Sequence, residues 1–162
     1  MHHIMKLYVL IILSAFLLSS CANTAGENIN EKASVTLNDQ LAENPLSQLV
    51  ITSSINENNH TMATLYGNEA ALKHARDNGS ENYPERAVLY QVTWKQKEDT
   101  VWFGAKIPEQ ILTVEKIDFY KDANAIKPRY TLYKGLPLVK KPVSNQTKRI
   151  DFIVHQKYAF VP

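Results

Sequence analysis

The chain has few of the residues that most often identify an enzyme or a metalloprotein. Its 162 residues contain one cysteine, Cys21, and only five glycines. A single cysteine cannot build an intramolecular disulfide or a multi-cysteine zinc site. The sequence also has no phosphate-binding glycine loop, nucleophile elbow, HExxH motif or carboxylate metal loop. We therefore expect the fold to depend on an ordinary packed core, and we predict no metal site.

Charge and histidine content narrow the function further. The formal net charge is +2, and such near neutrality argues against nucleic acid as a partner. The three histidines beyond the first residues, His60, His74 and His155, are far apart in the sequence. Scattered histidines more often make local hydrogen bonds than bind a metal. For His74, which falls off the apolar stripe of a predicted helix, we expect a solvated position.

The N-terminus has the pattern of a signal peptide. A short segment with one lysine, Lys6, precedes the apolar run from Leu7 to Leu18. This run is too short to span a bilayer as a helix, which takes about 20 residues. It is instead typical of a leader that is removed, and we assign residues 1–20 to it.

The end of this leader resembles the lipobox of bacterial lipoproteins, through Leu18-Ser19-Ser20-Cys21. The resemblance implies that Cys21 carries lipid at the N-terminus of the mature protein, which leaves no free thiol for catalysis. If the source is Gram-negative, it also implies that the protein is located on the periplasmic side of the outer membrane. The residue after Cys21 is Ala22, and not the aspartate that favours retention in the inner membrane. The alternative is an ordinary secretory signal with an incidental cysteine. With lipidation, residues 21–45 form the lipidated terminus and a tether, and residues 46–162 form the domain.

The stretch 83–108 predicts a β-hairpin whose two arms alternate apolar and polar residues. Pairing the arms across a loop at residues 96–99 sets Trp94 opposite Val101 and puts both apolar rows on one face. We therefore expect Trp94 and Phe103 in the core. Trp102 points the other way, and we expect another element to cover it. The alternative is that Trp102 is exposed and contacts a ligand or a partner. The apolar rows are Val88, Tyr90, Val92 and Trp94 in the first arm, and Val101, Phe103, Ala105 and Ile107 in the second.

The other segments complete an α+β domain, mainly an antiparallel sheet with a few packed helices. Asn68 is a good N-cap for a helix that ends at Asn78-Gly79. Apolar patterns predict strands over residues 46–55, 111–120 and 129–134, and a loop over 136–145. A short helix is predicted over residues 35–44. The period of residues 150–161 is ambiguous between helix and strand.

Four runs in order resemble the cytochrome P460 domain family. They are residues 60–71 (HTMATLYGNEAA), Tyr83-Pro84, residues 92–99 (VTWKQKED) and residues 102–108 (WFGAKIP). The similarity extends from about His60 to Glu115, with weaker echoes at residues 133–138 and 158–161. The resemblance implies a largely antiparallel sheet with packed helices and a periplasmic location. The haem-containing members of the family carry a c-type haem. They include hydroxylamine-oxidising enzymes and gas-binding cytochromes.

The chain departs from these haem-containing members at the attachment motif. They carry CxxCH near the C-terminus, whereas this chain has Asp151 and Val154 at the two cysteine positions and keeps only His155. No cross-linking lysine is carried over. We therefore expect a lipoprotein without covalent haem that binds a small ligand or an envelope partner and is not an oxidoreductase. The alternatives are a redox or gas-binding protein that holds haem non-covalently through His155 as axial ligand, and a purely structural envelope protein.

Overall fold

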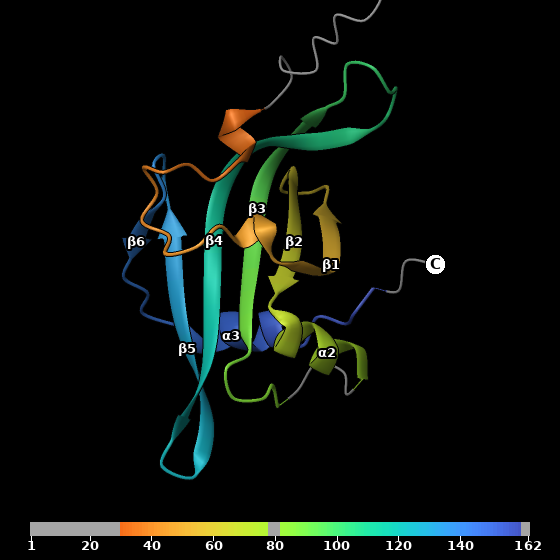
Figure 1. Ribbon diagram of the computed structural model, residues 1–162. Helices are drawn as coiled ribbons and strands as arrows, with labels where there is room; N and C mark the ends of the chain where they lie inside the picture. The colour runs from red at the N-terminus through yellow and green to blue at the C-terminus, as the bar shows by residue number, and fades with distance from the viewer. Residues whose placement is uncertain (1–29, 78–81, 160–162) are drawn as a thin grey trace, which may run out of the picture.

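A computed structural model describes residues 30–77 and 82–159. Its centre is a six-stranded antiparallel sheet in which every strand pairs with the next along the chain, in the order β1 to β6 (Figure 1). The mainly antiparallel α+β architecture predicted from the sequence is confirmed. The strands are β1 (Leu49–Asn56), β2 (Thr61–Gly67), β3 (Val88–Glu98), β4 (Lys106–Asp122), β5 (Ala125–Lys134) and β6 (Val139–Lys141).

Two α-helices pack into one core on the side of the sheet that we call the helix face. Helix α2 (Glu69–Asp77) follows β2, and α3 (Thr147–Val154) follows β6; Figure 1 shows α3 behind the strands and α2 at the end of β2. Ala71 and Ala75 of α2 and Ile153 of α3 are buried on the helix face against Leu89 and Ile117 of the sheet. The ambiguous final segment is thus helical in its first part. Among the described residues, no helix has the length and apolar character needed to cross a membrane.

The opposite side, here called the front face, is covered by residues 30–48 (Figure 1). This segment contains two short 3-10 helices, η1 (Glu31–Ala33) and η2 (Pro45–Ser47). It contributes partly buried apolar side chains to a second core around Tyr90, Val92 and Trp94. Much of what we expected to be tether therefore packs on the sheet. The contributing side chains are Ala33, Val35, Leu41 and Leu46.

The helix predicted over residues 35–44 is wrong. The segment makes a turn in which the Asp39 carboxylate accepts hydrogen bonds from the backbone N–H of Thr36 at 2.7 Å and of Leu138 at 2.6 Å. The second bond ties the turn to the distant residue that precedes β6. A side chain that bonds backbone groups in this way competes with helix formation, and here tertiary contacts decide the outcome.

The predicted hairpin register is also wrong. Strand β3 pairs with a later part of the chain, so that Trp94 lies opposite Ile111 and Val92 opposite Val114. The connecting loop comprises residues 99–105. Strand β4 continues through Pro108, which lies opposite Gln96. The register shifts between Lys95 and Gln96, so the pairing is irregular where proline has no backbone N–H to donate.

This register changes where the aromatic residues lie. Trp94 is 5% exposed, as predicted for a core residue. Phe103, which we also predicted in the core, is fully exposed, and the expectation that Trp102 is covered is wrong because it is 71% exposed. Both residues belong to the loop and not to a strand. The predicted strands at 46–55, 111–120 and 129–134 are found as β1 and as parts of β4 and β5.

Candidate functional site: an apolar hollow on the front face

A hollow of about 520 Å³ lies on the front face over β1 and β2. Alternation along β2 puts Met62, Thr64 and Tyr66 on this face. Their neighbours are Ile55 and Ser53 on β1, which lie opposite Met62 and Thr64, and Trp94 on β3, which lies opposite Met62. The covering segment contacts β2 at η2, whereas Ile55 on the outer strand β1 remains 59% exposed.

The chemistry of the hollow suits an uncharged, mostly apolar molecule. None of the described residues that line it carries a charge, and Met62, Ile55, Trp94 and Pro108 supply apolar walls. Its polar groups are hydroxyls, including the Ser53 and Thr64 pair at 3.0 Å. The Tyr66 phenol is protonated at neutral pH and can donate a hydrogen bond, and burial raises its pKa further above the ordinary value. Ligand pockets typically have this volume and this balance of apolar wall and few polar groups.

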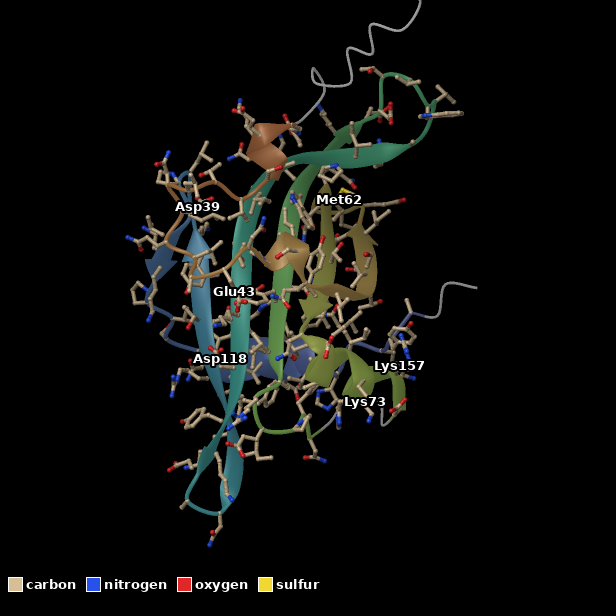
Figure 2. All side chains as sticks on the ribbon, in the orientation of Figure 1. Asp39, Glu43, Met62, Lys73, Asp118 and Lys157 are labelled. Atoms are coloured by element: carbon tan, nitrogen blue, oxygen red, sulfur yellow. The ribbon has the colours of Figure 1, made fainter. Side chains whose placement is uncertain are left out.

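Trp94 and the covering segment form the inner wall of the hollow. The Trp94 indole N–H donates a hydrogen bond to the backbone oxygen of Ala33 at 2.9 Å, which fastens η1 over β3. Asn30 reaches the same end of the sheet, and its amide donates to the backbone oxygens of Pro108 at 3.0 Å and Glu109 at 2.8 Å. These contacts hold the rim beside Pro108. Figure 2 shows Met62 at the end of the sheet from which the β3–β4 loop projects.

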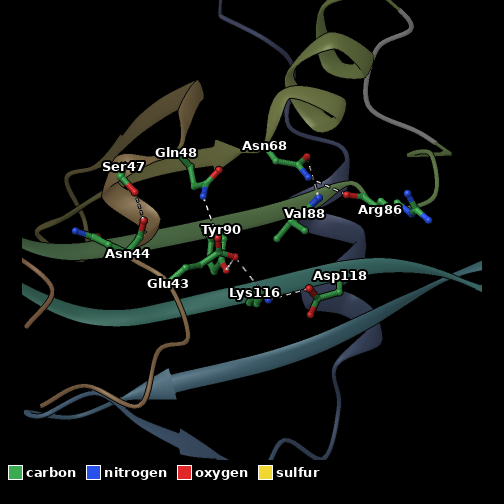
Figure 3. A network of polar contacts seen from close by, with 10 residues as sticks. All are labelled: Glu43, Asn44, Ser47, Gln48, Asn68, Arg86, Val88, Tyr90, Lys116 and Asp118. Atoms are coloured by element: carbon green, nitrogen blue, oxygen red, sulfur yellow. Dashed lines mark hydrogen bonds and ion pairs between the residues drawn. The ribbon is translucent and has the colours of Figure 1, made fainter. Parts of the chain in front are cut away.

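A polar network fastens the rest of the covering segment to the sheet (Figure 3). The Tyr90 hydroxyl donates to the Glu43 carboxylate, which also accepts from the Gln48 amide at 3.1 Å. Lys116 bridges to Asp118 at 2.9 Å and lies over the Tyr90 ring. Burial, reinforced by the Glu43 carboxylate, raises the Tyr90 pKa well above its ordinary value. Tyr90 is 1% exposed, so its hydroxyl serves to position the covering segment, whereas the Glu43 side chain remains partly exposed.

The structure places the predicted haem ligand His155 outside the hollow. It ends α3, and its Nδ1 lies 2.7 Å from the backbone oxygen of Asp151 and 3.2 Å from the Asp151 carboxylate. A second hollow of about 430 Å³ is lined by the α3 residues Ile150 and Val154, but His155 lines neither of the two hollows. This arrangement does not favour haem held by His155, and we derive no haem chemistry from it.

The other predicted positions do not converge on one site. His60 lies in the β1–β2 turn with a φ of 49°, and the His74 ring packs on Tyr83 with centroids 4.7 Å apart. His74 is therefore half-buried and not solvated as expected. Within residues 30–77 and 82–159, no group of three or more histidine, cysteine, aspartate or glutamate side chains is placed to hold a metal ion. Cys21, the predicted lipid attachment site, lies outside the described residues.

Sequence reasoning missed Ser53, Met62 and Tyr66 as site residues. The alternation of Met62, Thr64 and Tyr66 was visible, but it predicts only that they share a face. Whether such a face is covered depends on how residues 30–48 cross the sheet, which no local pattern indicates. Comparisons with protein-family models and with curated proteins find no match to this chain.

Proposed function

We propose that the protein is a lipid-anchored bacterial envelope protein whose P460-like sheet domain binds a small apolar ligand in the front-face hollow. It acts as a binding module and not as an oxidoreductase. The observation that carries this proposal is the uncharged hollow between Met62, Tyr66 and Trp94. The resemblance of residues 60–115 to the cytochrome P460 family supports the fold assignment, together with the antiparallel sheet and its two helices.

The leader supports the location. Residues 1–20 have the pattern of a signal peptide, and the only cysteine follows directly in a lipobox-like setting. Lipid at Cys21 holds the domain at a membrane without crossing it, on the periplasmic side of the outer membrane in a Gram-negative cell. Fatty-acid labelling in the cell tests this step. Incorporation that is lost in Cys21→Ser supports it, and incorporation that persists in this variant rules out lipidation at Cys21.

Filling the hollow tests the binding function. Ser53 is exposed on β1, and its hydroxyl bonds only the neighbouring Thr64 among the contacts described. Ser53→Trp fills the hollow, whereas Ser53→Ala removes the same hydrogen bond without filling it. The probe is N-phenyl-1-naphthylamine, an uncharged apolar dye that fluoresces when it leaves water.

The dye titration has a clear expected result. We expect Ser53→Trp to weaken dye binding by about tenfold or more, equivalent to about 1.4 kcal/mol, and Ser53→Ala to bind like the wild type. Equal binding by both variants would place the dye elsewhere and contradict the proposal. Displacement by uncharged fatty alcohols of increasing chain length then reports the size of ligand that the hollow accepts.

A further inference from the structure

The β3–β4 loop, residues 99–105, presents three consecutive apolar side chains to solvent. Val101 is 77% exposed, Trp102 is 71% exposed and Phe103 is fully exposed. Soluble surfaces rarely carry large contiguous apolar patches unless another surface covers them. Tryptophan in particular is enriched where an apolar region meets water, as at a membrane interface.

The loop holds this shape through its own hydrogen bonds. The Asp99 carboxylate accepts from the backbone N–H of Val101 at 2.7 Å, and the Asp99 N–H donates to the Ala105 oxygen at 2.9 Å. Lys106 and Glu98 form an ion pair at its base. Gly104, with a φ of +80°, supplies the left-handed backbone that closes the turn. The apolar side chains are thus held outward by an organised loop.

The N-terminal end of the described chain lies at the base of this loop. Asn30 bonds the backbone oxygens of Pro108 and Glu109, which follow the loop in β4. Figure 1 shows η1 and the β3–β4 loop at the same end of the sheet. The β4–β5 hairpin, which contains Ile126, lies at the opposite end.

Chain length then limits how far this end can be from a membrane. Eight residues, 22–29, separate Cys21 from Asn30. Even fully extended, this connection spans at most about 30 Å. If Cys21 is lipidated, as proposed above, Asn30 at the loop end of the domain lies within about 30 Å of the bilayer surface.

We propose that the β3–β4 loop docks on the lipid bilayer, with Trp102 and Phe103 entering its interface. This inference rests on the proposed lipid anchor and adds a second contact to it. The contact is apolar and not electrostatic, because residues 95–109 carry three positive and three negative side chains. These are Lys95, Lys97 and Lys106 against Glu98, Asp99 and Glu109.

The test uses the only cysteine as an anchor. The chain from Cys21 to Pro162 is coupled through the Cys21 thiol to a maleimide-bearing lipid in phosphatidylcholine vesicles, with or without brominated acyl chains. Bromine quenches tryptophan at short range, and comparison with Trp102→Phe separates Trp102 from the buried Trp94. We expect loss of most of the Trp102 emission in brominated vesicles. Equal emission in both kinds of vesicle would overturn the proposal.

Two variants and two conditions complete the experiment. Phe103→Ser should reduce the quenching, while Ile126→Ser, an exposed apolar residue at the far end of the sheet, should leave it unchanged. Anionic lipid should not strengthen it, and a strong increase would contradict an apolar contact. Trp102 emission that changes with protein concentration in the absence of vesicles would assign the loop to contact between copies and overturn the proposal. Chemical coupling replaces acylation, so a failure here is distinct from a failure of the fatty-acid labelling.

Discussion

Arg149 in α3 makes a two-point ion pair with the buried carboxylate of Glu115 in β4. The Arg149 Nε donates to Oε1 at 2.8 Å, and a terminal guanidinium nitrogen donates to Oε2 at 2.5 Å. The Tyr130 hydroxyl donates to the same Oε1 at 2.5 Å. Glu115 is 4% exposed, so these donors replace the water that its carboxylate has lost. The pair fastens α3 to the centre of the sheet.

Breaking this pair is predicted to destabilise the domain. Arg149→Met leaves the Glu115 charge buried with only Tyr130 as a described partner. The expected loss is about 3 kcal/mol, at the low end for buried pairs because the Arg149 side chain is partly exposed. Urea unfolding followed by circular dichroism measures it. The double variant Glu115→Leu with Arg149→Met should recover most of the loss, and a double variant as unstable as the single one would contradict this account.

The cap of α2 is predicted to contribute to stability through three contacts of Asn68, of which Figure 3 shows those with Arg86 and Val88. The Asn68 Oδ1 accepts from the N–H of Ala71 at 3.0 Å and of Val88 at 3.2 Å, and its amide donates to the Arg86 oxygen at 2.8 Å. Asn68→Ala should lower the free energy of unfolding by about 1–2 kcal/mol. Asn68→Asp keeps the acceptor and should lose less in the same urea titration. Equal losses of unfolding free energy in the two variants would mean that the Asn68 cap bonds do not stabilise the N-terminus of α2.

Tyr83 is predicted to make stability fall at alkaline pH. Its hydroxyl is buried on the helix face with no hydrogen-bond partner among the described residues, and burial raises its pKa from 10.0 to about 12. Above pH 10 the Tyr83 hydroxyl ionises first in the unfolded chain, which favours unfolding. The free energy of unfolding that depends on this protonated hydroxyl is therefore complete below pH 10 and is lost as the pH rises towards 12.

Removing the hydroxyl separates this effect from those of other tyrosines. Tyr83→Phe should stabilise the protein by about 1 kcal/mol at neutral pH, because an unpaired buried hydroxyl is unfavourable. Its stability should also fall less between pH 10 and 12 than that of the wild type. Thermal unfolding across this pH range measures both effects, and parallel curves for the two proteins would contradict the assignment.

A fourth prediction concerns haem. His155 contacts Asp151 and lines neither hollow, so haemin added to the chain from Ala22 onward should give no stoichiometric Soret band. The absorption spectrum with and without His155→Ala checks this. A stoichiometric band that disappears in the variant would support the haem-binding alternative instead.

The parts of the fold that depend on local chemistry were predictable. Asn68 caps α2 as expected, and the row that contains Val92 and Trp94 lies on one face. The loop at residues 99–105 was not predictable, since Val101 and Phe103 alternate like a buried strand and only competition with Ile111 and Val114 decides the register.

The candidate site depends even more on distant contacts. Strand β3 is buried on both faces, because Leu89 packs under the helices while Val92 packs under residues 30–48. The hollow lies over the outer strands β1 and β2, beside Ile55 and Met62. Its position follows from bonds such as Trp94 to Ala33, which join residues 61 positions apart and leave no local signal in the sequence.

Met62 allows the most direct test of binding in the hollow. It is the only methionine after Met5, so a chain that begins at Ala22 and carries ¹³C-methyl methionine gives one methyl signal, from a wall of the hollow. On titration with N-phenyl-1-naphthylamine, we predict a saturable shift of this signal in the wild type and in Ser53→Ala, and none in Ser53→Trp. Dye binding that leaves the Met62 methyl unshifted, or shifts it equally in Ser53→Trp, would contradict the assignment of the front-face hollow as the ligand site.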